Sequence, residues 1–431
     1  MAKTTARTPQ PSSGPGNAAF VFILVMVGLD FLAFGLIAPV MPDLIRQFEG
    51  GDFARASDIT GYLLLVWNAM QFLFSPILGA WSDRFGRRPI ILLSCFGLGI
   101  DYIFMALAPT LGWLFVGRII SGITASNIST AYAYVTDVTP PEKRAKPFGY
   151  ISAAFGLGFV IGPAVGGYLG NSNLRAPFWA AAILSLINSL YGFFVLPESL
   201  PKEKRAKSAW RMANPLGSLK LLRSHPVLAG LATVVMLYYL AHTSLPSMWA
   251  LYTEERYGWS RRDVGLSLAV VGVCASIISG VLVGPFVKRF GERRSVLFGL
   301  LCGTLGFAGF ALAASGWMLY AVIPFIALWG IAAPAIQSLM SRRVDPSSQG
   351  KLQGAINSLR AITGMAGPVL FTQVFALAIS PQARIHLPGA PYYLAAVLLL
   401  SSLLLAVYVT RSRAETIAPQ QQPAVSLDPS D

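Results

Sequence analysis

Three ionisable side chains interrupt long apolar runs of the chain: Asp30, Asp101 and Arg118. Placing such a group at the centre of a bilayer costs at least ~2.5–3.5 kcal/mol, so it is a candidate for function. Burial favours the neutral form of a carboxyl group, and a nearby arginine favours its charged form. A carboxyl group between these two influences can bind and release a proton. We therefore predict that these three residues couple protons to a reaction or movement. The alternative is a static ion pair that only supports the fold.

Further polar side chains lie within apolar runs and could contact a ligand. Histidine titrates near neutral pH, so His242 could exchange a proton there, or it could be a hydrogen-bonded packing residue. Arg360 could attract an anionic group, or it could extend its charge to the membrane surface. The residues that we predict to bind substrate are Gln71, Asn68, His242, Gln337 and Asn357.

Composition shows which elements must hold these side chains. The chain has 431 residues, of which 54% are apolar and 12% charged, whereas soluble domains carry about 25% charged residues. A membrane-spanning helix needs about 20 mostly apolar residues. Twelve such windows are expected, at 18–42, 58–80, 90–108, 111–134, 147–169, 176–196, 226–250, 263–287, 295–314, 317–340, 352–378 and 391–410.

The basic residues set the expected orientation of these helices. Most of the 33 Lys and Arg lie in the two tails and in the even-numbered connections, and basic connections face the cytoplasm. We therefore expect a multi-pass membrane protein with both termini in the cytoplasm. Because the basic residues lie in short segments between apolar runs, the net charge of +14 does not indicate a nucleic-acid partner. The lipid bilayer is the expected surrounding.

An internal repeat divides the chain. At one constant offset, Arg84-Phe85-Gly86 matches Arg289-Phe290-Gly291, and Gly162-Pro163 matches Gly367-Pro368. Parallel repeats are related by an axis along the membrane normal, and the substrate site lies between them near the midplane. We predict an all-α integral membrane protein whose twelve helices form two pseudo-symmetric six-helix bundles. Its expected parts are a tail 1–17, a bundle 18–196, a cytoplasmic linker 197–225, a bundle 226–410 and a tail 411–431.

Two motifs could control a movement of the bundles. The first joins the second and third spans, where Gly86 permits a tight turn and Asp83 could pair with neighbouring arginines; the alternative is a solvated basic turn. The second lies in the fifth span, where glycines allow close helix packing and Pro163 bends the helix; the alternative is ordinary packing. The predicted gating residues are Gly79, Asp83, Arg84, Gly86, Arg87, Arg88, Gly158, Gly162, Pro163 and Gly166.

These motifs resemble those of the major facilitator superfamily. Gly79 to Pro89 looks like its cytoplasmic loop motif, and Gly156 to Gly167 looks like the motif of its drug–proton antiporters. Over residues 20–410 the chain resembles the tetracycline efflux transporters within that group. The resemblance implies a transporter of a bacterial inner membrane, with Asp30, Asp101 and Arg118 in proton coupling and Gln71 beside the substrate. It also implies that Asp83, Arg84 and Arg87 stabilise the outward-facing state.

Three positions depart from that family pattern. A proton-linked His and a nearby Gln correspond to Ala275 and Ser279, and an Asp corresponds to Gly303. The second copy of the loop motif has Lys288 in place of Asp83, so the two latches are expected to be unequal. The second half therefore offers little acidic chemistry for coupling.

The expected function is proton-coupled efflux of small amphipathic molecules or drugs, tetracycline-like compounds among the candidates, by alternating access. The alternative is a proton-coupled importer of a small nutrient or metabolite. Neither a catalytic arrangement of Ser, His, Asp or Cys nor a metal-binding pattern is evident in the sequence, so we expect no enzyme, no metal and no cofactor. The expected partners are a small-molecule substrate and protons, and the expected state is a monomer.

Overall fold

The computed structural model describes residues 17–125, 127–140, 145–205, 219–222, 226–345 and 348–411. Residues 1–16 and 412–431 of the predicted tails, and much of the predicted linker 197–225, lie outside the described residues. In the described part every regular element is helical, and twelve helical stretches are long and apolar enough to cross a membrane. The all-α membrane class predicted from the sequence is confirmed. Because the number of spans is even, the first span begins and the last span ends on the same side.

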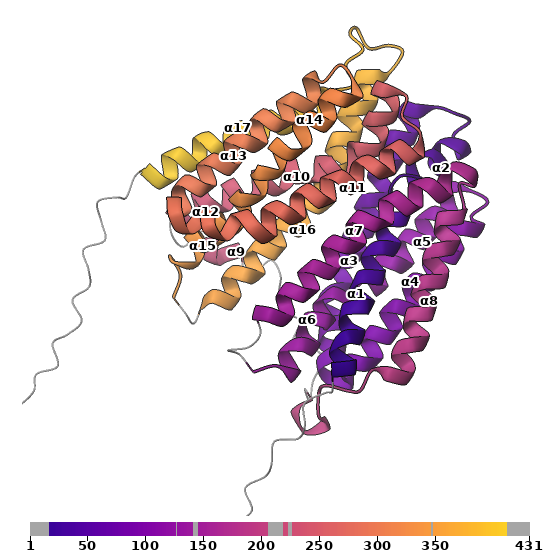
Figure 1. The fold of residues 1–431 in the computed structure, drawn as a ribbon, viewed down its shortest axis with the longest axis vertical. Helices are drawn as coiled ribbons and strands as arrows, with labels where there is room; N and C mark the ends of the chain where they lie inside the picture. The colour runs from indigo at the N-terminus through magenta and orange to yellow at the C-terminus, as the bar shows by residue number, and fades with distance from the viewer. Residues whose placement is uncertain are drawn as a thin grey trace, which may run out of the picture.

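Two bundles stand beside each other, the first drawn in indigo to magenta and the second in rose to yellow (Figure 1). The first contains α1 (Asn17–Ile37), α2 (Met41–Phe48), α3 (Phe53–Phe85), α4 (Arg87–Leu107), α5 (Leu111–Thr124), α6 (Asn127–Val138), α7 (Ala145–Ser172) and α8 (Ala176–Val195). Two short elements follow, η2 (Lys202–Lys204) and α9 (Leu219–Leu222). The second bundle contains α10 (Pro226–Tyr257), α11 (Arg261–Ile277), η3 (Ile278–Leu282), α12 (Val283–Phe290), α13 (Glu292–Leu312), α14 (Gly316–Ala327), η4 (Leu328–Ile331), α15 (Ala332–Ser341), α16 (Gln349–Ile379) and α17 (Ala390–Arg411).

Glycine and capping residues determine where several helices begin and end, and the glycine turns occur at matched positions of the two repeats. The turn between α3 and α4 has Gly86 at φ 111°, and the matching turn between α12 and α13 has Gly291 at φ 77°. Only glycine adopts such angles without steric cost. At the start of α11, Ser260 and Asp263 form a capping box, in which each side chain binds the other's backbone N–H. The two halves thus use the same turn at matched positions.

Several spans are less regular than the sequence indicates. The span expected at 263–287 contains the π-helical turn η3, and the one expected at 317–340 contains the 3₁₀ turn η4. The window 111–134 is divided between α5 and α6, and the separate short helix α2 follows the first span. Non-helical hydrogen bonding inside a helix is common at functional sites and hinges. η3 and η4 contact each other within the second bundle.

The bundles contact each other along α7 with α11 and along α3 with α16. The contact lies toward one end of the helices, where a Cβ on Gly265 would overlap the Pro163 carbonyl group and the Ser57 hydroxyl donates to the Thr372 carbonyl at 3.2 Å. Toward the end where α1 begins and α17 ends, the ribbons of the bundles diverge (Figure 1). We call the first end the contact side and the other the tail side.

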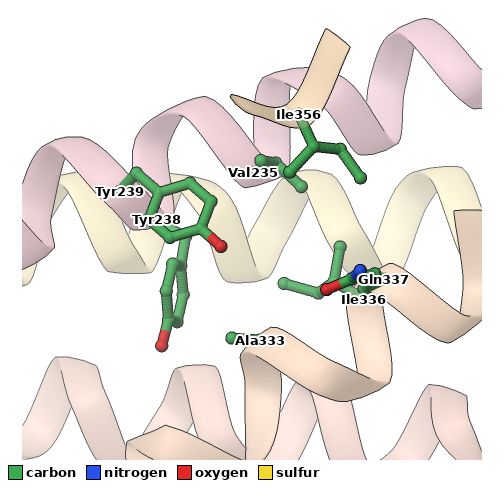
Figure 2. Close-up of a pocket in the computed structure, with 7 residues that line it drawn as sticks. All are labelled: Val235, Tyr238, Tyr239, Ala333, Ile336, Gln337 and Ile356. Carbon is green, nitrogen blue, oxygen red and sulfur yellow. The ribbon is translucent and has the colours of Figure 1, made fainter. Parts of the chain in front are cut away.

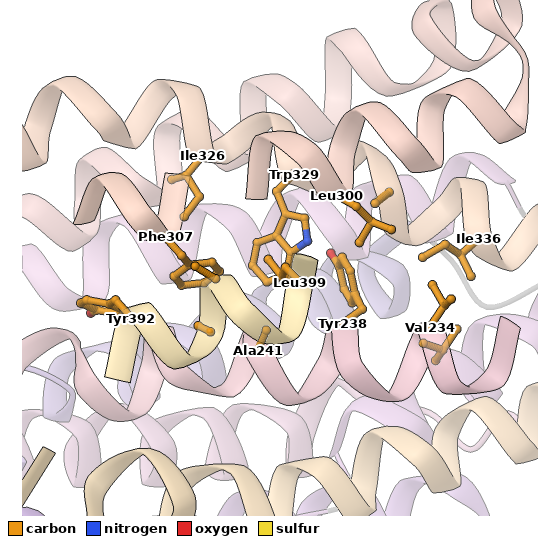
Figure 3. Packing of buried hydrophobic residues seen from close by; sticks show 14 of the residues in the cluster. Val234, Tyr238, Ala241, Leu300, Phe307, Ile326, Trp329, Ile336, Tyr392 and Leu399 are labelled. Atoms are coloured by element: carbon orange, nitrogen blue, oxygen red, sulfur yellow. The ribbon is translucent and has the colours of Figure 1, made fainter. Parts of the chain in front are cut away.

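The second bundle is held by an aromatic core. Trp329 of η4 lies between Phe307, Tyr238 and Leu399, which come from three different helices (Figure 3). The Trp329 ring is 4.7 Å from that of Tyr238 and 5.3 Å from that of Phe307, measured between centroids. A Cβ on Gly303 would lie 2.7 Å from the Trp329 ring. The position that carries Asp in the resembled family is therefore filled here by an indole ring.

Candidate functional site

Asp101 and Arg118 meet inside the first bundle. Asp101 on α4 is fully buried, and Arg118 on α5 is 5% exposed. Arg118 Nη2 lies 3.9 Å from Asp101 Oδ2, which is longer than a hydrogen bond. A Cβ on Gly117 would lie 2.6 Å from Asp101 Oδ1, so the absence of that atom leaves room for the carboxylate. The arrangement is a loose, buried ion pair, and a group in such a pair can change its protonation state without breaking strong hydrogen bonds.

A cavity of about 90 Å³ lies between the two bundles, and Arg118 forms part of its wall. Phe34 and Phe159 line it from the first bundle, and Trp249 and Leu268 line it from the second. The wall is otherwise almost entirely apolar, with the hydroxyl groups of Thr60 and Ser247 as further polar atoms. Small-molecule sites combine such apolar walls with a few placed polar groups. We refer to this space as the central cavity.

The structure places the other predicted residues of the first bundle near this pair. Asp30, Asp101 and Arg118 all lie within electrostatic range of Tyr102, so Asp30 is close to the pair. Gln71 on α3 donates to the Ala125 carbonyl at 3.4 Å, next to the end of α5.

Asn68 on α3 donates to the Leu64 carbonyl at 2.8 Å. Its Oδ1 faces Gly364 of the second bundle, since a Cβ there would lie 3.1 Å away. Asn68 is thus at a point where α3 of the first bundle touches α16 of the second.

The predicted substrate residues of the second bundle lie on three helices. His242 on α10, Gln337 on α15 and Asn357 on α16 are all exposed, although they occupy membrane-spanning helices. The His242 ring lies 5.6 Å from the ring of Trp329. Gln337 donates to Gln353 at 3.0 Å. It also borders a pocket of about 10 Å³, across which lie Tyr238 and Tyr239 (Figure 2). That volume is close to the minimum for one water molecule.

Two ion pairs that the sequence did not predict join the bundles on the contact side. Asp43 of α2 pairs with Arg261 at the start of α11. Arg46 of α2 lies 2.8 Å from Glu254 near the end of α10. Because Met41 of the same short helix lines the central cavity, these pairs close the cavity at that end. We call them the interbundle ion pairs.

The predicted loop motif forms a network with α6 and with the segment directly after α8. Arg87 Nη1 lies 2.5 Å from Asp83 Oδ1, and Arg87 Nε lies 2.9 Å from Asp137 Oδ2 at the end of α6. The backbone N–H of Arg87 donates to Glu198 at 2.8 Å. The sequence did not identify Asp137 and Glu198 as members of this site.

Two further arginines and a glycine of that motif lie outside this network. Arg84 lies over the Phe85 ring at 5.2 Å, and Arg88 donates to the Phe193 carbonyl at 2.5 Å. A Cβ on Gly79 would meet no atom within 4 Å, so that position is open in this conformation. Asp83 is therefore engaged by Arg87 of its own bundle in this conformation.

The second bundle holds the same pair with the charges exchanged. At the repeat offset Glu292 corresponds to Arg87 and Arg342 corresponds to Asp137. Arg342 Nε lies 2.9 Å from Glu292 Oε1, the same separation as in the first bundle. Comparison of the repeats by identity misses this pair, because each position carries the opposite charge in the other copy. We call the two pairs the inverted ion pairs.

The glycine motif of α7 packs this helix against α1. A Cβ on Gly158 would lie 2.6 Å from the Gly28 carbonyl oxygen, and one on Gly166 would overlap the Leu36 carbonyl group. Pro163 lies inside α7, and its carbonyl faces Gly265 of the other bundle. The motif therefore holds α7 against α1 on one face and against α11 on another.

Replacement of Gly162 with Ala is expected to lower the melting temperature of the purified protein. The added Cβ would lie 2.6 Å from the Leu32 carbonyl oxygen and 2.8 Å from Gly35 Cα, and backbone atoms cannot turn aside as a side chain can. Such overpacking costs about 1–3 kcal/mol. Thermal unfolding followed by tryptophan fluorescence measures the change. Gly149→Ala is the matched control, because a Cβ at that position of α7 meets no atom within 4 Å. Equal melting temperatures for the two variants would contradict the close packing.

Two helical bundles with matching turns, a central cavity between them and a buried ion pair whose arginine lines that cavity define a membrane transport protein. The profile of the Major Facilitator Superfamily matches residues 23–368. The chain belongs to this superfamily, as the loop and glycine motifs predicted.

Known proteins of the superfamily are similar to this chain over most of its length. The tetracycline resistance protein, class C, from Escherichia coli is 40% identical over 379 residues, which cover 88% of this chain and 95% of that protein. The crystal structure of the human organic anion transporter MFSD10 (TETRAN) is 26% identical, covers 92% of this chain and 100% of its own, and has a TM-score of 0.66. A bacterial homologue of the human lysosomal transporter Spinster, in an inward-facing and occupied conformation, has a TM-score of 0.74 at 18% identity, covering 93% of this chain and 98% of its own; this likeness concerns the fold.

Proposed function

We propose that the protein is a proton-driven exporter of small amphipathic molecules, tetracycline-like compounds among them, in the inner membrane of a bacterium. The observation that carries the proposal is the loose pair of Asp101 and Arg118, in which Arg118 lines the central cavity and Asp101 is buried behind it. The carboxyl group of Asp101 is thus one residue away from the space that a substrate would enter, and Arg118 links the two. The tetracycline resistance proteins to which the chain is similar support a drug as the exported molecule.

The two ends of the bundles support transport by alternating access. The interbundle ion pairs and the contacts between α7 and α11 close the contact side, and the bundles diverge on the tail side (Figure 1). We assign the tail side to the cytoplasm, because most basic residues lie in the tails and in connections on that side. The conformation is then inward-facing, ready to take substrate from the cytoplasm. One chain holds both halves of the pathway, and we propose that it acts as a monomer.

Inverted membrane vesicles that contain the protein test the proposal. With an imposed proton gradient, acidic inside, they should accumulate labelled tetracycline, and a protonophore should abolish the accumulation. Vesicles from the same strain without the protein are the control. If the compound instead accumulated only in right-side-out vesicles, the importer alternative would hold. Equal tetracycline uptake with and without the gradient would contradict proton coupling.

A further inference from the structure

Arg360 of α16 is the feature that the proposed function does not use. It occupies the middle of a membrane-spanning helix and is exposed. Its Nη2 donates to the Tyr239 hydroxyl of α10 at 2.5 Å, and its guanidinium lies 4.6 Å from the Tyr239 ring centroid. Among the described residues no carboxylate pairs with it, since the ion pairs of the second bundle involve other residues. Four of the five N–H groups of a guanidinium therefore remain available to a ligand.

The faces of α10 and α16 that carry this group point toward the other bundle. Residues three or four positions apart share one helix face, so Arg360 lies on the face of Gly364, which contacts Asn68 of the first bundle. Likewise Tyr239 lies on the face of Pro246, which lines the central cavity. Arg360 is one helical turn, about 6 Å, to the tail side of the contact between Gly364 and Asn68. It does not extend toward a membrane surface, because Tyr239 holds it in place.

Away from the ends of the described membrane-spanning helices, the first bundle carries carboxylates and the second bundle carries a guanidinium and no carboxylate. In residues 226–411 every Asp and Glu lies near a helix end or in a connection: Glu254, Glu255, Asp263, Glu292 and Asp345. The fully buried Asp101 belongs to the first bundle, and the second bundle presents a guanidinium without a carboxylate at the same level. A cation approaching Arg360 would be repelled, while a carboxylate or another oxyanion would be attracted and could form two parallel hydrogen bonds.

We propose that the exported molecules are amphipathic organic anions and that Arg360 binds their anionic group. This inference rests on the proposed function and names its substrate class. Arg360 donates to the anion, and the Tyr239 hydroxyl, which accepts from Arg360, donates its own proton to the same group. Asn357 lies one turn along α16 on the same face and offers an amide. The apolar body of the substrate packs in the central cavity, where Phe34 and Trp249 form part of the wall.

Two dyes of one scaffold and opposite charge test the substrate class. Fluorescein is anionic at neutral pH and rhodamine 123 is cationic, and both carry the same planar xanthene ring system. In inverted vesicles with an acidic interior, the full-length protein should accumulate fluorescein and not rhodamine 123. Uptake of rhodamine 123 in preference to fluorescein would overturn the proposal.

Variants of Arg360 test the residue itself. Arg360→Gln should reduce the fluorescein uptake rate about 10- to 100-fold, the factor expected for loss of a charged hydrogen-bonded contact, and Arg360→Lys should keep part of the rate because it keeps the charge. Arg384→Gln, at an exposed position outside the spans, should change nothing. Melting temperatures of the purified variants separate loss of binding from loss of folding. Fluorescein uptake by a folded Arg360→Gln variant at the unmodified rate would refute the role of Arg360.

The same vesicles separate failure of this inference from failure of the proposed function. A protein that accumulates labelled tetracycline under the gradient but neither dye would keep the proposed function and overturn the anion site. A protein that moves none of the three compounds would contradict the proposed function itself. Fluorescein uptake that ignores the proton gradient would support the anion site and contradict proton coupling.

Discussion

Asp101→Asn is expected to abolish gradient-driven accumulation of substrate, with a loss of about 100-fold or more, the scale on which positioned proton-transfer groups act. Asn fills the same volume beside Gly117 but cannot bind and release a proton. Because Asp101 is fully buried and lies 3.9 Å from Arg118, no water-exposed carboxylate can replace it from the surface. Exchange of labelled for unlabelled substrate, without a gradient, should survive in the variant.

The measurement is paired uptake in inverted vesicles, with and without the imposed proton gradient. Asp345→Asn is the matched control, because Asp345 is an exposed carboxylate in the connection after α15. Gradient-driven uptake by Asp101→Asn at the rate of the unmodified protein would reject the assignment. If the variant lost exchange as well as gradient-driven accumulation, Asp101 would support the fold as a static ion pair rather than couple protons.

Charge reversal in the interbundle ion pairs is expected to open the contact side. Arg261→Asp places two carboxylates, on Asp43 and at residue 261, where an ion pair now joins the bundles. Loss of such a pair costs up to about 1 kcal/mol, and repulsion between the two carboxylates adds to the cost. The population of the inward-facing state should therefore fall about tenfold relative to the outward-facing one, and the transport rate should fall with it.

The double variant Asp43→Arg with Arg261→Asp restores opposite charges in exchanged order. It should recover both the population of the inward-facing state and the transport rate. Spin labels at positions 55 and 384, one on each bundle, would report the separation of the contact side. The control is the double variant Glu49→Arg with Arg55→Glu, because that ion pair lies within the first bundle alone. Since residue 55 is then substituted, the spin label on the first bundle is placed at another position. A double variant no better than Arg261→Asp would show that these residues do not act as a pair.

The spans and their division into two bundles could be predicted, because apolar length and a constant repeat offset are properties of short stretches of sequence. The irregular turns η3 and η4 could not, since apolar composition does not distinguish a π-helical or 3₁₀ turn from an α-helix. The predicted window 18–42 ran past the end of α1 for the same reason, because the residues between Ile37 and Pro42 remain apolar where the helix has already ended.

Contacts of the site within one bundle could be predicted from the sequence more readily than contacts between the bundles. Asp101 and Arg118 could be proposed as partners because both interrupt apolar runs that neighbour each other along the chain. The interbundle ion pairs join residues more than 200 positions apart, and nothing local distinguishes Asp43 or Glu254 from other charges at helix ends. Arg360 remained undecided between an anion site and an extended surface position until its bond to Tyr239 fixed its direction.

The inverted ion pairs make the two halves of this chain unequal partners. Matched positions of the repeat carry Arg87 and Glu292, and Asp137 and Arg342, so each half keeps one ion pair within its own bundle but in exchanged order. A residue copied from one half to the matching position of the other would therefore meet a like charge in its own bundle: Glu at position 87 would face Asp137, and Arg at position 292 would face Arg342.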